Sequence, residues 1–177
     1  DTGLLSEGLM MQQASVNNAS VYEVSRAYPE ADFKVILNLA IMVGKIKDVS
    51  QVMPYLESEI DAVRFWGLVG IDAYEGEIDA IFSQLHGMLS DEAPAVAIKA
   101  AEILIKREEN KLAYKVLGEM LLLADEVQVL QAAISVRQLG AKANPLIPLI
   151  KEEVFPKYSG DIWGRYRSWS YPMFIGM

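Results

Sequence analysis

Cysteine is absent from the 177-residue sequence, and histidine occurs once, as His86. The absence of cysteine excludes disulfides, thiolate zinc sites and a cysteine nucleophile. A single histidine cannot form a histidine-rich metal site, and it supports few of the acid–base mechanisms that use histidine. No second type of ligand clusters with His86 along the sequence, so we expect an ordinary polar position on a helix.

Long hydrophobic runs are also missing, since none approaches the roughly 20 residues that a membrane-spanning helix needs. The longest candidate, residues 35–44, is interrupted by Asn38 and predicts a buried helix instead. No basic stretch followed by an apolar one marks a signal peptide. Because the first residue is Asp1 rather than Met, we expect a mature protein or a fragment of a longer one.

Positive charge is scarce: 16 Lys and Arg stand against 24 Asp and Glu, for a net charge of −8. An acidic surface repels phosphate backbones, so we expect no nucleic-acid partner. The acidic stretch 75–79 does not fit an EF-hand loop, because Gly76 falls fifth, not sixth, counted from Asp72. Phosphate-binding glycine loops are absent too, and we expect no metal or cofactor in this chain.

Helical patterns dominate what is present, and 52% hydrophobic residues supply a core for one domain. From about residue 32, apolar residues recur at spacings of three and four, as in an amphipathic helix. This predicted face consists of Phe33, Ile36, Leu37, Ala40 and Ile41. Gly44 is placed as its C-cap, and Asp48 with Gln51 predicts a capping box for the next helix.

An internal repeat organises the middle of the chain. Segment 61–68 has one counterpart 33 residues further on and another after a further 32 residues. An apolar helix is expected before each copy, and one more after the last. These four helices are predicted at 49–57, 78–89, 112–123 and 144–152. The unit is therefore a helix–turn–helix of about 33 residues, repeated three times and flanked by partial units.

Small residues recur where the second helices of neighbouring units would meet. A single helix pair cannot bury its apolar face alone, so such units stack into a continuous core. Small side chains let the stacked helices approach closely. The small residues in question are Gly67, Ala100, Ala101, Ala132 and Ala133.

The second helix of each unit resembles the opening of the second helix in HEAT-like repeats, including their short bacterial form. Residues 61–64 and 95–101 carry the likeness, while Ala97 and Val129 replace the arginine found at Arg64. The expected fold is all-α: a short right-handed solenoid (an α–α superhelix) of about seven or eight helices. An irregular segment opens it at 1–31, repeats fill 32–154, and an aromatic-rich tail or cap forms 155–177.

The first thirty residues are, as a whole, too polar to form a repeat unit. Ser20 and Glu23 predict a capping box for one short helix that ends before Pro29. Residues 1–10 and 20–29, followed by HEAT-like repeats, resemble the C-terminal extension of bacterial sulfatases of the alkaline-phosphatase-like type.

The resemblance implies that catalysis resides in an upstream α/β domain with formylglycine and calcium. That parent would hydrolyse sulfate esters or sulfamates in the periplasm or outside the cell. No Ser of this chain is followed by x-Pro-x-Arg, so no catalytic residue is assigned and the chain itself is expected not to be an enzyme. Its role would be to brace the catalytic domain, shape the substrate entrance or mediate oligomer contacts.

A free-standing repeat adaptor is the alternative. Its acidic surface would favour a basic protein partner bound on the concave face. The apolar start at Leu4, Leu5, Met10 and Met11 favours a neighbouring domain over a polar cap. A HEAT-like DNA-repair glycosylase needs a basic groove, which the net charge argues against. Whether the chain self-associates is left open.

Two groups of residues are candidates for an interaction surface. Tail residues Trp163, Arg165, Tyr166, Arg167 and Trp169 could stack on sugars and pair with sulfate or phosphate, although packing or docking is the favoured role.

Arg64 and Trp66 could form an exposed cation–π pair. We favour partial packing of Phe65 and Trp66, with Arg64 paired to a carboxylate of the nearby turn.

Overall fold

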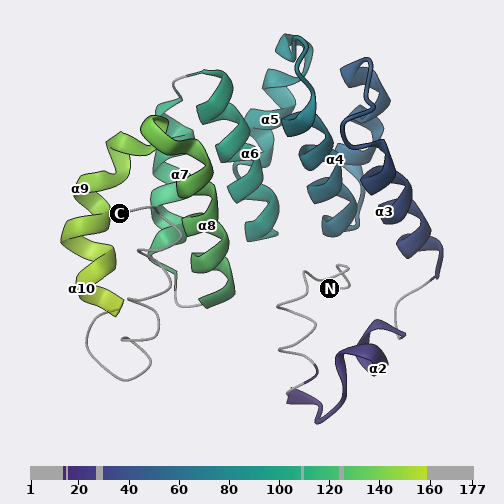
Figure 1. Cartoon of the computed structure of the whole chain (residues 1–177), viewed down its shortest axis with the longest axis horizontal. Helices are drawn as coiled ribbons and strands as arrows, with labels where there is room; N and C mark the ends of the chain where they lie inside the picture. Colours follow the sequence, from purple (N-terminus) through teal and green to yellow (C-terminus); the bar gives the residue numbers. More distant parts are fainter. Residues whose placement is uncertain (1–13, 15, 27–29, 109, 124–125, 159–177) are drawn as a thin grey trace. The chain divides into compact units, whose positions relative to one another are not determined.

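All regular secondary structure in the described residues is helical, with no strand among them (Figure 1). The computed structural model describes residues 14, 16–26, 30–108, 110–123 and 126–158. The all-α expectation is therefore confirmed for those ranges. The chain divides into two compact units, Asp1–Ser83 and Gln84–Met177. This division falls inside the predicted repeat region 32–154, and it cuts through a helix.

In its described residues, the first unit has two α-helices of 13 residues, which are preceded by a shorter one and joined by short 3-10 helices. Its elements are α2 (Val21–Ser25), α3 (Glu30–Met42), the 3-10 helices Val49–Gln51 and Met53–Glu57, α4 (Asp61–Ala73) and the 3-10 helix Asp79–Ile81. Helix α5 (Phe82–Met88) follows directly and carries the chain across the division between the units.

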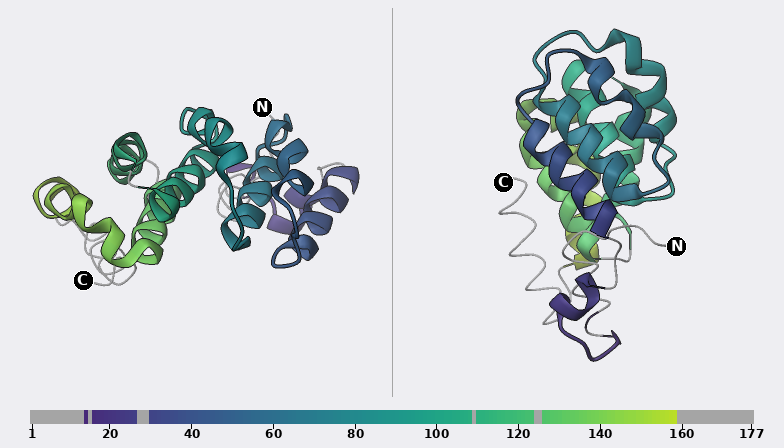
Figure 2. Two further views of the ribbon diagram at one scale, coloured as in Figure 1. Left: turned by 90° about the horizontal axis from the view of Figure 1, so that it is seen from above. Right: turned by 90° about the vertical axis from the view of Figure 1, so that its right-hand side faces the viewer.

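The second unit centres on three long helices that lie side by side (Figures 1 and 2). These are α6 (Pro94–Arg107), α7 (Lys111–Leu121) and α8 (Glu126–Leu139). The chain then continues through the 3-10 helix Gly140–Leu146, α9 (Ile147–Leu149), the π-helical turn Ile150–Val154 and α10 (Phe155–Tyr158). Helix α10 spans the start of the predicted tail at residue 155.

Helices α4, α6 and α8 begin at the three predicted copies of the repeat, or one residue before them. Positions related by the same spacings of 33 and 32 residues are buried in all three helices. Such sets are Arg64, Ala97 and Val129; Gly67, Ala100 and Ala132; and Ile71, Leu104 and Val136. The sequence repeat therefore coincides with a repeated pattern of buried positions.

Proline alters two of the four other helices that the sequence predicts, the first and the last. The helix predicted at 49–57 is two 3-10 helices, separated at Val52. Pro54 has no N–H to donate, and it disfavours the α conformation at the residue before it. The helix predicted at 144–152 is likewise divided into 3-10, α and π pieces around Pro145 and Pro148.

Glycine allows the close approach expected in the first repeat. A Cβ added at Gly67 would lie 2.9 Å from Cδ2 of Leu56, in the 3-10 helix that packs on α4. In the second unit, Ala100 and Ala101 are fully buried where α6 packs against α7 and α8. Small residues therefore stand at helix contacts in both units.

The helix caps follow the local sequence. Capping boxes are present at Ser20 with Glu23 and at Asp48 with Gln51, as predicted. Gly44 has a φ of +74°, the left-handed conformation that a helix C-terminus favours and that glycine adopts without strain.

The predicted buried face of α3 is wrong in part. Leu37 and Ile41 are 58% and 61% exposed, whereas Leu39 is 2% exposed. Two residues along a helix correspond to about 200°, so Leu39 lies on the side opposite Leu37. Helix α3 packs on α4, and the side with Leu39 is the one that is covered. Within the described ranges, no helix is long and apolar enough to cross a membrane.

Candidate functional site

A carboxylate is buried in the centre of the second unit. Glu102 of α6 is 1% exposed, and one of its oxygens, Oε1, lies 3.1 Å from Nζ of Lys99 and 2.6 Å from Nζ of Lys106. The hydroxyl of Ser135 on α8 donates to the other oxygen at 2.7 Å. The side-chain amide of Gln138, with its nitrogen turned toward α6, donates to both oxygens at 2.7 and 3.2 Å.

These contacts make Glu102 a link between helices. A buried charge is costly unless it is paired and hydrogen-bonded, and this carboxylate has charged and neutral donors on every side. Ser135 and Gln138 are one turn apart on α8, so the bonds connect α6 to α8 at one register. Both oxygens of Glu102 thus accept hydrogen bonds from protein donors.

Sequence reasoning missed Glu102. The signal was present: Glu102 is the one acidic residue between 93 and 107, with lysines three residues before it and four after it. Such spacing places all three side chains on one helix face. That this face is turned into the core is decided by the position of α8.

His86 occupies a polar position on α5, as expected, and it lies near a carboxylate that is distant in the sequence. Its Nε2 is 3.1 Å from Oε1 of Glu108, and both side chains are about 40% exposed (41% and 39%). The amide nitrogen of Asn110 is 3.0 Å from the same carboxylate oxygen and 3.3 Å from each ring nitrogen. This contact is made by residues 22 and 24 positions apart, which sequence spacing alone does not bring together.

The role of this contact is also to hold helices. The side-chain oxygen of Asn110 caps α7 by accepting from the N–H groups of Leu112 and Ala113. His86 is at the end of α5, so the group ties α5 to the turn between α6 and α7. Among the residues that the structure describes, no three histidine, aspartate or glutamate side chains gather in a way that could hold a metal ion.

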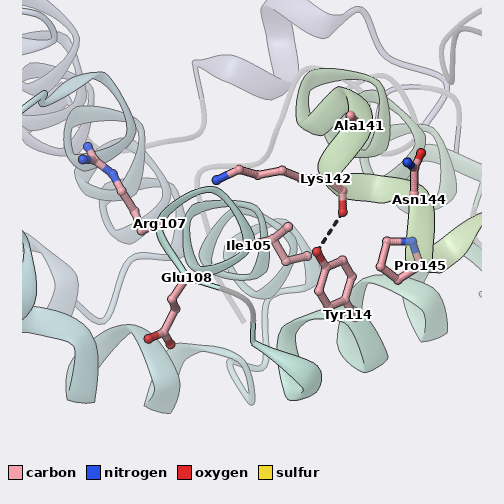
Figure 3. Close-up of a pocket in the computed structure, with 8 residues that line it drawn as sticks. All are labelled: Ile105, Arg107, Glu108, Tyr114, Ala141, Lys142, Asn144 and Pro145. Carbon is pink, nitrogen blue, oxygen red and sulfur yellow. Dashed lines mark hydrogen bonds between the residues drawn. The ribbon is translucent and has the colours of Figure 1, made fainter.

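A cavity of about 410 Å³ opens where the end of α6 and the start of α7 meet the 3-10 helix after α8 (Figure 3). The hydroxyl of Tyr114 donates to the backbone carbonyl of Lys142 at 2.7 Å, and the Lys142 ammonium donates to the carbonyl of Lys106. Figure 3 shows Arg107 and Glu108 pointing away from the ring of Tyr114. Binding sites need a few convergent polar groups, and here the polar groups close a helix junction instead.

Of the predicted interaction surface, Arg64 lies in the interior. Arg64 is 8% exposed, and its Nη1 donates to the carbonyl of Ser58 at 2.7 Å. The interpretation that we did not favour, an exposed cation–π pair, is therefore wrong: the guanidinium holds the turn that leads into α4. The arginine is buried because its position in the repeat faces inward, as the equivalent Ala97 and Val129 do.

The neighbouring aromatic side chains agree with the packing that we favoured. Trp66 is half-buried, and its ring meets that of Phe65 edge to face, with centroids 6.4 Å apart and planes at 84°. The remaining predicted residues, Trp163, Arg165, Tyr166, Arg167 and Trp169, lie outside the described residues.

The exposed side of α3 is the remaining candidate. Leu37 and Ile41 are one turn apart on the same side of the helix, and more than half of each side chain is accessible to solvent. Comparison of this chain with protein-family models, with curated proteins and with solved structures gave no match. Functional inference therefore rests on the arrangement of its own residues.

Proposed function

We propose that this chain is a non-catalytic helical-repeat module of the HEAT-like type, with a structural or protein-interaction role. The observation that carries the proposal is the contrast between the helices that repeat and the helix that precedes them. Buried positions recur in α4, α6 and α8 at the repeat spacing, whereas α3 exposes Leu37 and Ile41. Repeat arrays need a polar outer face on a terminal unit that meets water. An apolar outer face therefore favours a protein neighbour.

The two polar clusters support the same role. Glu102 joins α6 to α8, and His86 with Glu108 joins α5 to the α6–α7 turn. In both clusters, polar atoms form bonds that connect one helix to another helix or turn. A catalytic group, in contrast, must reach a substrate in an accessible cleft.

We further propose that the neighbour is the catalytic domain of a sulfatase, preceding this module in one polypeptide. The resemblance of residues 1–10 and 20–29 to sulfatase C-terminal extensions supports this part. The parent would hydrolyse sulfate esters or sulfamates with its own formylglycine and calcium, in the periplasm or outside the cell. The alternative is a free-standing adaptor for another protein.

Two measurements test the proposal: the activity of the chain itself and the reading frame that lies upstream of it. We expect the purified 177-residue chain to give helical circular dichroism and no hydrolysis of an aryl sulfate. We also expect the reading frame upstream of Asp1 to encode a Cys/Ser-x-Pro-x-Arg motif in an α/β domain. Hydrolysis by the chain alone would contradict the non-catalytic role. A start codon or signal peptide directly before Asp1 would favour the adaptor.

A further inference from the structure

The apolar side of α8 that packs on α6 repeats itself at almost every turn. Its buried apolar residues are Val129, Ala132, Ala133, Val136 and Leu139. When this pattern is moved by three or four residues, most of its positions fall on other apolar positions of the same pattern. Apolar contact has no direction, so such a surface can pack on α6 at more than one register.

The bonds to Glu102 do not repeat in this way. Its two donors on α8 are the Ser135 hydroxyl and the Gln138 amide, one turn apart. A slip of α8 by one turn, three or four residues in either direction, replaces one of these two donors by an apolar residue. The replacing residues would be Ala132, Ile134, Leu139 or Ala141. A buried oxygen that loses its donor is costly, so the slipped arrangements are disfavoured.

The other two repeats place apolar residues at the position of Glu102. The spacings of 33 and 32 residues relate Glu102 to Val69 in α4 and to Ile134 in α8, and both are half-buried. A helix of this type therefore does not need a carboxylate at that position in order to pack. Well-packed apolar residues often stabilise a protein as much as a buried ion pair does, or more. Stability alone is thus a weak explanation for Glu102.

We propose that Glu102, Ser135 and Gln138, here called the Glu102 network, fix the register at which α8 packs on α6. The apolar surface supplies most of the attraction, and the network selects one of the arrangements that this surface allows. Buried polar residues set the register of coiled coils in the same manner. The segments that follow α8, up to α10, move with it, so their positions in the second unit depend on this selection.

A second polar contact between these helices is less selective. After the end of α8, the Lys142 ammonium donates to the carbonyl of Lys106, and Tyr114 donates to the carbonyl of Lys142. These bonds place the ends of α6 and α8 together, so the two helices run in the same direction. Both bonds are exposed, where water can replace a lost partner, and a long lysine side chain can follow a shift.

The experiment measures the distance between two spin labels on the full chain by double electron–electron resonance. The labels are attached at Glu92→Cys and Arg137→Cys, and the absence of native cysteine makes the labelling specific. Both sites are exposed; Glu92 lies two residues before α6, and Arg137 lies near the end of α8. A slip by one turn should change the separation by about 5 Å. With the network intact, we expect one distance.

Two variants remove the network in different ways. Ser135→Ala/Gln138→Ala removes both donors on α8 but leaves Glu102 paired with Lys99 and Lys106. Glu102→Met/Ser135→Ala replaces the buried polar contact by apolar side chains. In both, we expect a second distance, shifted by about 5 Å, in roughly a tenth of the molecules or more. The urea midpoint of Glu102→Met/Ser135→Ala should be no lower than that of Glu102→Ala.

Two control variants separate selection from stability and from the second contact. Leu104→Ala removes a fully buried side chain of α6 and leaves the network in place. Tyr114→Phe/Lys142→Met removes the side-chain donors at the ends of the helices. Both controls should give the single distance of the parent chain.

Three results would overturn the proposal. The first is a single, unshifted distance in the network variants; if one of them loses its helical circular dichroism, the other decides. The second is an equal second distance in Leu104→Ala, which would mean that any loss of stability frees the register. The third is a second distance in Tyr114→Phe/Lys142→Met alone, which would assign the register to the contact at the helix ends.

Discussion

Helices α3 and α6 are both rich in apolar residues, yet they are buried to very different extents. Helix α3 is the more apolar of the two, but it exposes Leu37 and Ile41. Helix α6 buries every residue from Ala100 to Ile105, including the charged Glu102. The difference lies in their neighbours, because α6 packs against both α7 and α8, whereas α3 packs on α4. Burial is therefore a property of where a helix lies as much as of what it contains.

The largest effect should come from comparing leucines in the two helices. Leu104 of α6 is fully buried, so Leu104→Ala should lower the free energy of unfolding by about 3 kcal/mol, through lost transfer energy and a cavity. Leu37→Ala in α3 should change it by less than about 0.5 kcal/mol. Urea unfolding followed by circular dichroism measures both. Equal losses would show that the exposed side of α3 is covered in solution.

The second comparison concerns the buried and exposed ion pairs. Glu102→Ala should cost about 2–3 kcal/mol, because it removes the acceptor of the buried Ser135 hydroxyl and the carboxylate that pairs with Lys99 and Lys106. The estimate lies below that for a fully buried pair, since Lys106 is 31% exposed and can be hydrated. The matched control is Glu119→Ala, whose pair with Lys115 is exposed and 3.8 Å long. It should change stability by less than about 0.5 kcal/mol.

A double variant sharpens this result. If the Ser135 bond belongs to the same network, Glu102→Ala and Ser135→Ala should together cost clearly less than the sum of their separate effects. Additive losses would instead mean that Ser135 and Glu102 stabilise the second unit independently.

The third comparison is between a glycine at a helix contact and an exposed glycine. Gly67→Ala should destabilise the first unit by about 1 kcal/mol, because the added Cβ meets Leu56 at 2.9 Å. Gly87→Ala in α5 should stabilise by about 0.5 kcal/mol, since nothing lies within 4 Å of the added Cβ and alanine favours helix. The midpoint of thermal unfolding should therefore fall for Gly67→Ala and rise for Gly87→Ala. A gain at both positions would argue against close packing at Gly67.

The smallest effect is a pH dependence in the first unit. Hydrogen bonds from the side chain and the backbone of Ser50 hold the pKa of the Asp48 carboxyl below its usual value. The folded state therefore favours the carboxylate, and this contribution is fully present above the ordinary pKa of about 4. It is lost as the pH falls through the lower pKa of the folded state.

The variant Asp48→Asn provides the control, because asparagine also caps helices but does not titrate. Between about pH 5 and pH 3, the urea midpoint of the wild type should fall slightly more than that of the variant. Parallel curves would show that Asp48 does not contribute to the acid sensitivity of the first unit.

Residues that act locally could be predicted from the sequence. The capping boxes at Ser20 and Asp48 involve partners three residues away, so their spacing alone identifies them. The repeat period identified α4, α6 and α8, because a helix that must bury one face shows that face in its residue order. The type of helix at 49–57 was predicted less well, since Pro54 favours short 3-10 segments over one α-helix.

The candidate site was largely beyond sequence reasoning. Arg64 was a candidate for an interaction surface, but the repeat turns its position inward. The contact of His86 with Glu108 joins residues 22 positions apart, and that of Glu102 with Ser135 joins residues 33 apart. Contacts between residues so far apart in the sequence leave no pattern in the residues around either partner.

The sequence by itself determined that this protein is helical, where its long helices begin, and which small residues meet other helices. These properties depend on interactions within a few residues or on a period that repeats along the chain. Only the tertiary structure decided which side of α3 faces water and which polar groups surround Glu102. Both depend on the neighbour that a helix face meets, and a helix with two apolar sides cannot specify that neighbour through its own residues.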